Sequence, residues 1–269
     1  MSTTLSERIE RIARDASHGG SWLAREALET IIEASKRGED PLAVGRALVA
    51  ARPGVGAIAG ALGRVLASAR TPEQLVQEAH ALIAERDRAA KAIAVLVQED
   101  VRGVVMTHSA SATVREALLH SLPQRVVCTV SEPIGEGRPF SEELRRSGLE
   151  VELVADEEAA RAAATADLVL VGADTVFRDG TLLNKAGTRG LAAAARSARV
   201  PLVVACEVIK LAPMGPPESP EERTDLTPPE LIDRFVTEEG AFAPEDVASL
   251  IDRTPFLVEG YAQLRPPGP

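Results

Sequence analysis

Apolar side chains recur every three or four positions through the first 98 residues, which is the period of an α-helix with one buried face. The first such stripe consists of Leu5, Ile9, Ile12 and Ala16. The last stripe, which extends toward Gln98, consists of Leu75, Ala79, Leu82 and Ile93. We therefore predict an N-terminal helical domain over residues 1–98.

Two helix starts in this region are marked by a capping residue followed by proline. Asp40-Pro41 and Thr71-Pro72 each place a side chain that can accept a backbone N–H before a proline that fits the first helical turn. Gln74 stands three residues after Thr71, where it can complete a capping box. These signals predict helices that begin at residues 41 and 72.

The pattern changes after Asp100 to short apolar runs that alternate with segments of helical character. The runs are GVVMT (103–107), RVVCTV (125–130), LEVELV (149–154), ADLVLVG (166–172) and VPLVVAC (200–206). Such alternation is typical of βαβ units, which build a parallel sheet with helices on both faces. The predicted class is α/β, with a Rossmann-like domain and a C-terminal extension over residues 99–269. In that extension, the acidic, proline-rich stretch 211–228 predicts an exposed loop, and a short helix is expected from Pro229.

Composition limits the possible partners and location of the protein. Hydrophobic residues make up 45% of the chain and aromatic residues only 3%, so the core must consist mainly of small aliphatic side chains. The net charge of −10 disfavours binding to nucleic acid. No apolar run approaches the roughly 18 residues that a membrane span needs, and the N-terminus lacks the apolar centre of a signal peptide. We expect a cytoplasmic protein in which Cys128 and Cys206 are reduced and buried.

Polar side chains close several of the predicted strands, at the edge where open α/β sheets bind ligands. They are Thr107, His108 and Ser109, then Ser131 and Glu132, then Asp174, and finally Cys206, Glu207 and Lys210. His108 is either a proton-transferring group, since histidine titrates near neutral pH, or a structural residue that points away from the face occupied by Ser109. Cys206 either presents a thiol to this edge or is an inert core residue.

The segment GADTVFRDGTLLNKAGTRGLAAAA (172–195) offers a candidate anion site. Asn184 and Lys185 precede a predicted helix that starts at Gly187 and Thr188. Free backbone N–H groups at a helix start bind anions, phosphate above all. The alternative is an ordinary helix cap beside a solvated lysine. The glycine-rich GVGAIAG (54–60) predicts no dinucleotide site, because it follows Arg-Pro rather than a strand and has the wrong spacing.

Taken in order, several segments resemble one protein superfamily. They are THSASATV (107–114), SEPIGEGRPFSEEL (131–144), LVGADTVFRDGTLLNKAGTRGLA (170–192), LVVACEVIK (202–210) and LTPPELIDRFVTEEG (226–240). The superfamily joins the regulatory alpha, beta and delta subunits of translation initiation factor 2B to the aldose-phosphate isomerases that act on ribose 1,5-bisphosphate or methylthioribose 1-phosphate. A weaker likeness extends to SHGGSWLARE (17–26) and ARPGVGAI (51–58).

The resemblance implies roles for particular residues. In the isomerases a cysteine after the first strand takes a proton from C2 of the ring-opened sugar, and the aspartate of the GAD motif is the general acid; Ser109 and Asp174 stand at these positions. Residues that would hold the phosphate and hydroxyl groups of the substrate are His18, Gly19, Gly20, Ser21, Arg52, Asn184, Lys185 and Lys210. Arginine and lysine pair readily with phosphate, and an enclosed aspartate can donate a proton. At the position of Glu136 some isomerases have a glutamine that touches the substrate, although a solvated loop charge is an equal alternative.

The departure from the isomerases lies at the base. A serine hydroxyl is far too weakly acidic to replace a cysteine, whose thiol has a pKa of about 8.5. Loss of the cysteine resembles the regulatory subunits, whereas Asp174, Asn184 and Lys185 resemble the isomerases. Two hypotheses follow: an isomerase of aldose 1-phosphates with an altered base position, or a non-catalytic sensor of a sugar phosphate or nucleotide that acts through a protein partner. The resemblance also implies a homodimer without a redox cofactor or metal.

Overall fold

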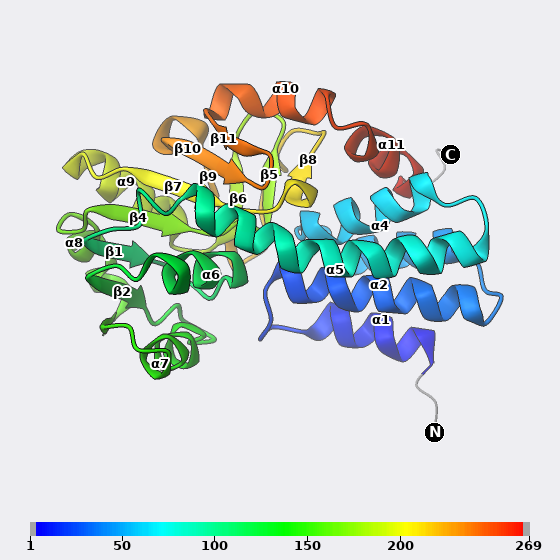
Figure 1. The fold of residues 1–269 in the computed structure, drawn as a ribbon, viewed down its shortest axis with the longest axis horizontal. Coiled ribbons are helices and arrows are strands. Elements are labelled where there is room, and N and C mark those ends of the chain that lie inside the picture. Colours follow the sequence, from blue (N-terminus) through cyan, green and yellow to red (C-terminus); the bar gives the residue numbers. More distant parts are fainter. Residues whose placement is uncertain (1–3, 266–269) are drawn as a thin grey trace.

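A computed structural model describes residues 4–265; residues 1–3 and 266–269, at the ends of the two predicted domains, lie outside the described part. The predicted helical region is present, and Figure 1 shows its helices side by side. Its elements are α1 (Leu5–Arg14), α2 (Gly20–Lys36), α3 (Pro41–Ala51), α4 (Gly56–Ser68) and α5 (Pro72–Leu96). No helix in residues 4–265 is long and apolar enough to cross a membrane.

The helix starts follow the capping signals, with one correction. The Asp40 side chain accepts the N–H of Leu42, and that of Thr71 accepts the N–H of Gln74. The Gln74 side chain accepts from the N–H of Arg70 instead of that of Thr71, so the predicted capping box is only half formed. Proline at the next position sets the chain direction in both starts.

The α/β region alternates strands and helices as predicted. Its strands are β1 (Val104–Thr107), β2 (Arg125–Thr129), β3 (Val151–Val154), β4 (Leu168–Val171), β5 (Thr175–Phe177), β6 (Leu182–Lys185), β7 (Leu202–Ala205), β8 (Leu211–Ala212), β9 (Thr224–Thr227), β10 (Arg234–Thr237) and β11 (Gly240–Phe242). Its helices are α6 (Ala112–Ser121), α7 (Gly137–Arg146), α8 (Ala159–Ala163), α9 (Thr188–Ala198), α10 (Val247–Asp252) and α11 (Pro255–Leu264). Short 3-10 turns cover Asp156–Glu158, Val208–Lys210, Pro229–Leu231 and Pro244–Asp246.

Within the described residues, seven strands form the main sheet in the order β11-β10-β7-β4-β1-β2-β3. All neighbours are parallel except β10 and β11. The chain runs outward from β1 to β3, then returns to β4 and continues to β10 on the other side. The direction therefore reverses between β1 and β4, and such a switch point opens a crevice at the carboxyl ends of the two strands.

Alternating side chains of the buried strands pack against helices on both faces of the main sheet. On one face, Val105 and Val126 join a cluster with residues of α6, α7 and the end of α5. On the other, Met106 and Val127 join a cluster with residues of α9 and of the N-terminal helices. Successive residues of a strand point to opposite faces, which is why the continuous apolar runs identified these strands.

The C-terminal extension corrects part of the sequence prediction. The stretch predicted as an exposed loop contains β8 and β9, which lie at the two edges of a second sheet, β8-β5-β6-β9. The helix expected at Pro229 is only a 3-10 turn, after which β10 and β11 extend the main sheet. Each of these four strands has at most two apolar side chains, which is too weak a pattern to identify a strand.

Glycines allow α4 to lie close to its neighbours. A Cβ atom on Gly60 would lie 1.9 Å from the carbonyl oxygen of Ile209, and one on Gly63 would lie 2.8 Å from the backbone of Gly260 in α11. The helix α11 thus packs on the N-terminal helices although it ends the described chain (Figure 1). The GVGAIAG segment provides close helix packing beside the 208–210 turn. The domain division at residue 98 remains a prediction.

Candidate functional site

A cavity of about 740 Å³ lies where the carboxyl ends of β1 and β4 face the N-terminal helices. It brings together the ten residues to which the family resemblance assigns a catalytic or binding role: His18, Gly19, Gly20, Ser21, Arg52, Ser109, Asp174, Asn184, Lys185 and Lys210. These residues come from segments up to 192 positions apart, at His18 and Lys210. The cavity lies at the switch point between β1 and β4, where open α/β sheets bind ligands. The role of each residue in binding or catalysis stays a prediction.

The start of α2 forms the helical wall of the cavity. Gly19 precedes the helix without a side-chain cap, and a Cβ atom on Gly20 would lie 3.7 Å from an oxygen of Asp174. The hydroxyl of Ser21 donates to Glu207 at 3.1 Å, so this side chain is turned toward a carboxylate. Backbone N–H groups at a helix start favour an anion, which makes this wall suitable for phosphate.

A buried ion pair that sequence reasoning missed holds this helix start in place. Arg86 of α5 pairs with Glu207 at 2.8 Å and also donates to the carbonyl of Ser21 at 2.9 Å. Burial by itself would raise the pKa of Glu207, but the charges of Arg86 and Lys210 and the hydrogen bonds from Arg86 and Ser21 together outweigh burial and lower that pKa. Glu207 is therefore an ionised anchor and not a proton donor. Arg86 and Glu207 lie 121 residues apart, and no pattern in the sequence indicates that they pair.

His18 lies at the rim of the cavity and stacks on Trp22. The two ring centroids are 3.9 Å apart, and the Nδ1 atom of His18 is 2.8 Å from a carboxylate oxygen of Asp15. Arg52 donates to the carbonyls of Ile12 and Asp15, which ties it to the end of α1. Trp22 thus borders the cavity while remaining partly buried in the core.

Asp174 is the enclosed acid of the site. Burial raises its pKa, and the positive charges of Lys210 and Arg52 oppose that shift only in part. Lys210 donates to the carbonyl oxygen of Ala173 at 2.7 Å, which directs its ammonium group toward this strand end. A carboxyl with a raised pKa keeps its proton closer to neutral pH, so Asp174 is suited to act as a general acid.

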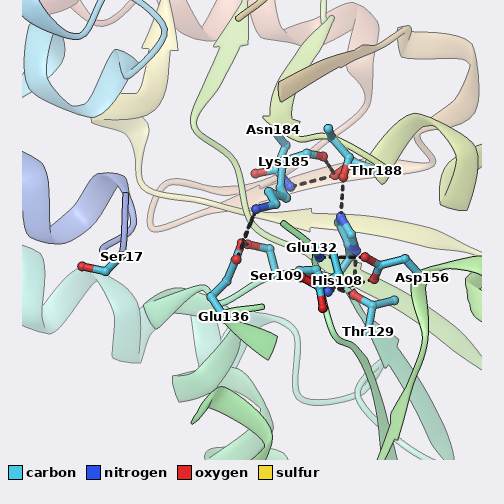
Figure 2. A network of polar contacts seen from close by, with 12 residues as sticks. Ser17, His108, Ser109, Thr129, Glu132, Glu136, Asp156, Asn184, Lys185 and Thr188 are labelled. Carbon is cyan, nitrogen blue, oxygen red and sulfur yellow. Dashed lines mark hydrogen bonds and ion pairs between the residues drawn. The ribbon is translucent and has the colours of Figure 1, made fainter. Parts of the chain in front are cut away.

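Ser109, Glu136 and Lys185 form a chain of contacts inside the cavity (Figure 2). The hydroxyl of Ser109 donates to Oε1 of Glu136 at 2.8 Å, and Nζ of Lys185 lies 2.9 Å from the same oxygen and 3.1 Å from Oε2. Ser109 has a φ of 65°, a left-handed conformation that side chains other than glycine seldom adopt and that is common at functional sites. Glu136 thus belongs to the site and is not a solvated loop charge.

His108 is engaged through both ring nitrogens. Nε2 lies 2.9 Å from the carbonyl oxygen of Ala186 and must donate to it, so Nδ1 accepts from the hydroxyl of Thr129 at 2.7 Å. Burial lowers the pKa of His108, so the ring is neutral. Ser131 continues the network, because its hydroxyl accepts the N–H of Ser109 at 2.9 Å. This geometry supports the structural interpretation of His108: it braces the loop that carries Ser109.

The predicted anion site at the start of α9 already holds a carboxylate of the protein. Asp225 accepts the N–H of Gly187 at 2.8 Å and that of Arg189 at 3.1 Å. Lys185 is buried against Glu136 and is not solvated, so neither sequence interpretation of this helix start describes it fully. A phosphate group would meet Lys185 in the cavity and not at the α9 N-terminus.

Two further findings concern the stretch predicted as an exposed loop and Cys206, for which the sequence left two alternatives. Glu221 to Thr224, within the stretch predicted as an exposed loop, line the cavity, and no sequence pattern marked them. Cys206 is fully buried and does not line the cavity, and burial raises the pKa of its thiol to about 12. Cys206 is therefore an inert core residue in this structure.

Comparison with known proteins gives the family. The model of the initiation factor 2 subunit family matches residues 16–223. The chain belongs to this family. It is 28% identical to ribose 1,5-bisphosphate isomerase of Archaeoglobus fulgidus over 280 aligned positions, which cover 89% of this chain and 90% of that protein.

Solved structures of family members share the fold. Translation initiation factor eIF-2B of Pyrococcus horikoshii OT3 superposes with a TM-score of 0.82 at 24% identity, over 91% of this chain and 98% of that one. A chain of the tetrameric eIF2B-beta2-delta2 complex from C. thermophilum superposes with a TM-score of 0.79 at 18% identity, over 93% of each chain. The α/β fold with its helical N-terminal region is thus common to this family.

Proposed function

We propose that this chain binds a sugar phosphate in the cavity and converts an aldose 1-phosphate to the ketose phosphate, with ribose 1,5-bisphosphate as the foremost candidate substrate. The observation that carries the proposal is the environment of Asp174, a half-buried carboxyl whose pKa is raised by desolvation and which lies in one cavity with Arg52, Lys185 and Lys210. Three cations can bind the two terminal phosphate groups of a sugar bisphosphate, and the acid between them can protonate the sugar.

The size and polarity of the cavity support this choice of ligand. A volume of about 740 Å³ falls within the range of small-molecule sites, roughly 300–1,000 Å³, and accommodates a phosphorylated pentose. The first turn of α2 lies within the described residues and carries no acidic side chain. The helical hydrogen bonds begin at the N–H of Trp22, so the N–H groups of Gly20 and Ser21 are available to a phosphate. The name of the Archaeoglobus fulgidus relative points to the same substrate.

The test combines binding with turnover. Purified protein is melted with ribose 1,5-bisphosphate, ribose 5-phosphate and adenosine monophosphate, and each stabilising compound is then assayed for ketose formation. We expect ribose 1,5-bisphosphate to raise the melting temperature and to be isomerised. Failure of every aldose phosphate to be isomerised by folded protein would refute the enzymatic proposal.

A second candidate function is favoured by Ser109, which stands where the isomerases have a cysteine. A non-catalytic sensor would bind a sugar phosphate or nucleotide and pass the signal to a protein partner. Its signature is stabilisation by a ligand without turnover, together with a specific partner that is retained in pull-downs. The eIF-2B relatives support this alternative by name.

We also propose that the chain forms a homodimer. The C. thermophilum complex joins two beta and two delta chains in a tetramer, which gives a precedent for association between family members. Light scattering after size exclusion is expected to give twice the 28.4 kDa mass of one chain. A mass of one chain at micromolar concentration would contradict this proposal.

A further inference from the structure

The base of the proposed isomerisation needs a group that the family's cysteine position no longer supplies. Six carboxylates in the described residues line the cavity: Asp15, Glu136, Glu143, Asp174, Glu221 and Glu222. Asp15 pairs with His18, Glu143 pairs with Arg115, and Asp174 is the acid. Glu221 and Glu222 are exposed to solvent. Glu136 is the one whose side chain receives a hydrogen bond from Ser109.

We propose that Glu136, positioned by Ser109, accepts the proton from C2 of the sugar and returns it to C1. This inference rests on the proposed isomerase function and assigns its base. Ser109 is then a positioning residue: its hydroxyl points to Oε1 of Glu136 and cannot itself serve as a base. The base of this chain would therefore be Glu136, which is hydrogen-bonded to residue 109, and not residue 109 itself.

The geometry of Glu136 leaves room for this role. Its carboxylate lies at the start of α7 with 14% of the side chain exposed, so it reaches the cavity without being freely solvated. Ser109 and Lys185 make three contacts with its two oxygens. A carboxylate has about four lone-pair positions, so one remains available for a proton from carbon. Carboxylates act as the base in other sugar-phosphate isomerases, triosephosphate isomerase among them.

The proton transfers balance without any further reactant. Asp174 gives its proton to the ring oxygen, and the bond from that oxygen to C1 breaks. Glu136 takes the proton from C2, and the electron pair of that bond forms the C1–C2 double bond of an enol. The enol hydroxyl on C2 then returns a proton to Asp174, while Glu136 protonates C1. C2 is oxidised to a ketone, C1 is reduced, and both carboxyl groups regain their starting states.

Lys185 connects this base to the phosphate-binding part of the cavity. Its ammonium group contacts both oxygens of Glu136. A substrate phosphate carries more negative charge than a carboxylate and competes for the same ammonium group. Substrate binding is therefore expected to free an oxygen of Glu136 at the moment when the base is needed.

The test uses Glu136→Gln with Glu142→Gln as its matched control, because Glu142 is an exposed carboxylate of α7, the helix that Glu136 directly precedes. With ribose 1,5-bisphosphate, we expect Glu136→Gln to lower kcat by about 10²- to 10⁴-fold, the usual contribution of a general base, while the ligand still raises the melting temperature. Glu142→Gln should match wild type in both measurements.

A double variant distinguishes proton transfer from a structural role. In Glu136→Gln with Ser109→Cys, a thiol stands again at the family's base position. We expect it to recover at least about tenfold of the lost kcat, with activity that rises toward a thiol pKa of about 8.5. Loss of stabilisation by the ligand in Glu136→Gln would instead show a binding role and overturn the inference.

The inference and the proposed function fail in different ways. If Glu136→Gln keeps kcat within about threefold of wild type while Asp174→Asn is inactive, the function stands and Glu136 is not the base. If wild-type protein binds sugar phosphates but isomerises none, the enzymatic function itself fails, and the assignment of Glu136 fails with it.

Discussion

At the scale of single residues, Asp174 combines two properties that oppose each other. Burial raises its pKa, which makes it a better proton donor and at the same time makes its ionised form costly to the fold. Lys210 and Arg52 reduce this cost without removing it. Functional sites commonly contain residues that lower stability, and Asp174 has the environment of such a residue.

The first prediction concerns Asp174→Asn. The amide cannot donate a proton as an acid, so kcat should fall by about 10²- to 10⁴-fold while sugar-phosphate binding persists. Because the folded pKa is raised, the carboxyl destabilises the fold once pH exceeds its unfolded pKa. Asp174→Asn should therefore raise the free energy of unfolding at pH 7.5, by about 0.5–2 kcal/mol. A lower melting temperature than wild type would show that the charge of Asp174 stabilises the cavity.

The second prediction concerns Glu238, which follows β10 and accepts the N–H of Val208 at 3.0 Å. Burial raises its pKa to about 7, with a further contribution from the charge of Glu207. Between about pH 4.5 and 7 the folded protein keeps a proton that the unfolded chain releases, so this group's contribution to stability falls as pH rises.

Glu238→Gln keeps an oxygen that can accept the N–H of Val208 but cannot ionise. Its gain in the free energy of unfolding over wild type should grow from pH 5 to pH 8 and reach about 1–3 kcal/mol. Urea unfolding at both pH values measures the difference. A gain that is equal at pH 5 and pH 8 would rule out ionisation of Glu238 as its source.

At the scale of elements, α4 packs closely on the turn that carries Lys210. Gly60 has no space for a Cβ atom, which would lie 1.9 Å from the backbone oxygen of Ile209. Gly190 in α9 has open space around its missing Cβ atom. The two glycines lie within helices of similar length and serve as a matched pair.

The third prediction uses this pair. Gly60→Ala should lower the free energy of unfolding by about 2 kcal/mol or more, because backbone must move to admit the methyl group. Gly190→Ala should raise it by about 0.5–1 kcal/mol, as expected for alanine in a helix. Chemical denaturation of both variants gives the comparison, and similar values for the two would refute close packing at α4.

The start of α9 provides the fourth prediction. Asp225 on β9 accepts two N–H groups there, although it lies 38 residues after Gly187. Asp225→Ala should cost about 1–2 kcal/mol of stability, and Asp225→Asn, which retains an acceptor, should cost less. Hydrogen exchange of the Gly187 and Arg189 amides should accelerate in the alanine variant. Unchanged protection would mean that these amides do not depend on Asp225.

At the scale of the whole molecule, the sequence identified those strands whose apolar residues can be recognised within one short segment. Five strands of the main sheet have at least three apolar side chains among their four or five residues, and this pattern can be read within each segment. The strands β8 to β11 were not predicted, because each has at most two apolar side chains. All of them except β11 also pair with strands that are not their neighbours in the sequence. The helix α11 packs against α4 through two glycines that no periodicity singles out.

For the site, too, the sequence predicted one part, the residues, and not the other, their contacts. Resemblance in the sequence supplied the ten residues that the fold brings to one cavity. It did not supply their contacts: Ser109 with Glu136, Arg86 with Glu207, and Asp225 with the start of α9. Each of these contacts joins positions 27 to 121 residues apart, and pairing over such distances depends on the folded chain.

Isomerisation of ribose 1,5-bisphosphate in deuterated water, followed by nuclear magnetic resonance, tests both the function of the cavity and its chemistry. Wild-type protein should consume the aldose and form the ketose with some deuterium at C1, since a carboxyl that carries the proton can exchange it with solvent. Asp174→Asn should leave the sugar unchanged. An unaltered aldose in the presence of wild-type protein that this sugar stabilises against heat would contradict the isomerase and leave a sugar-phosphate sensor.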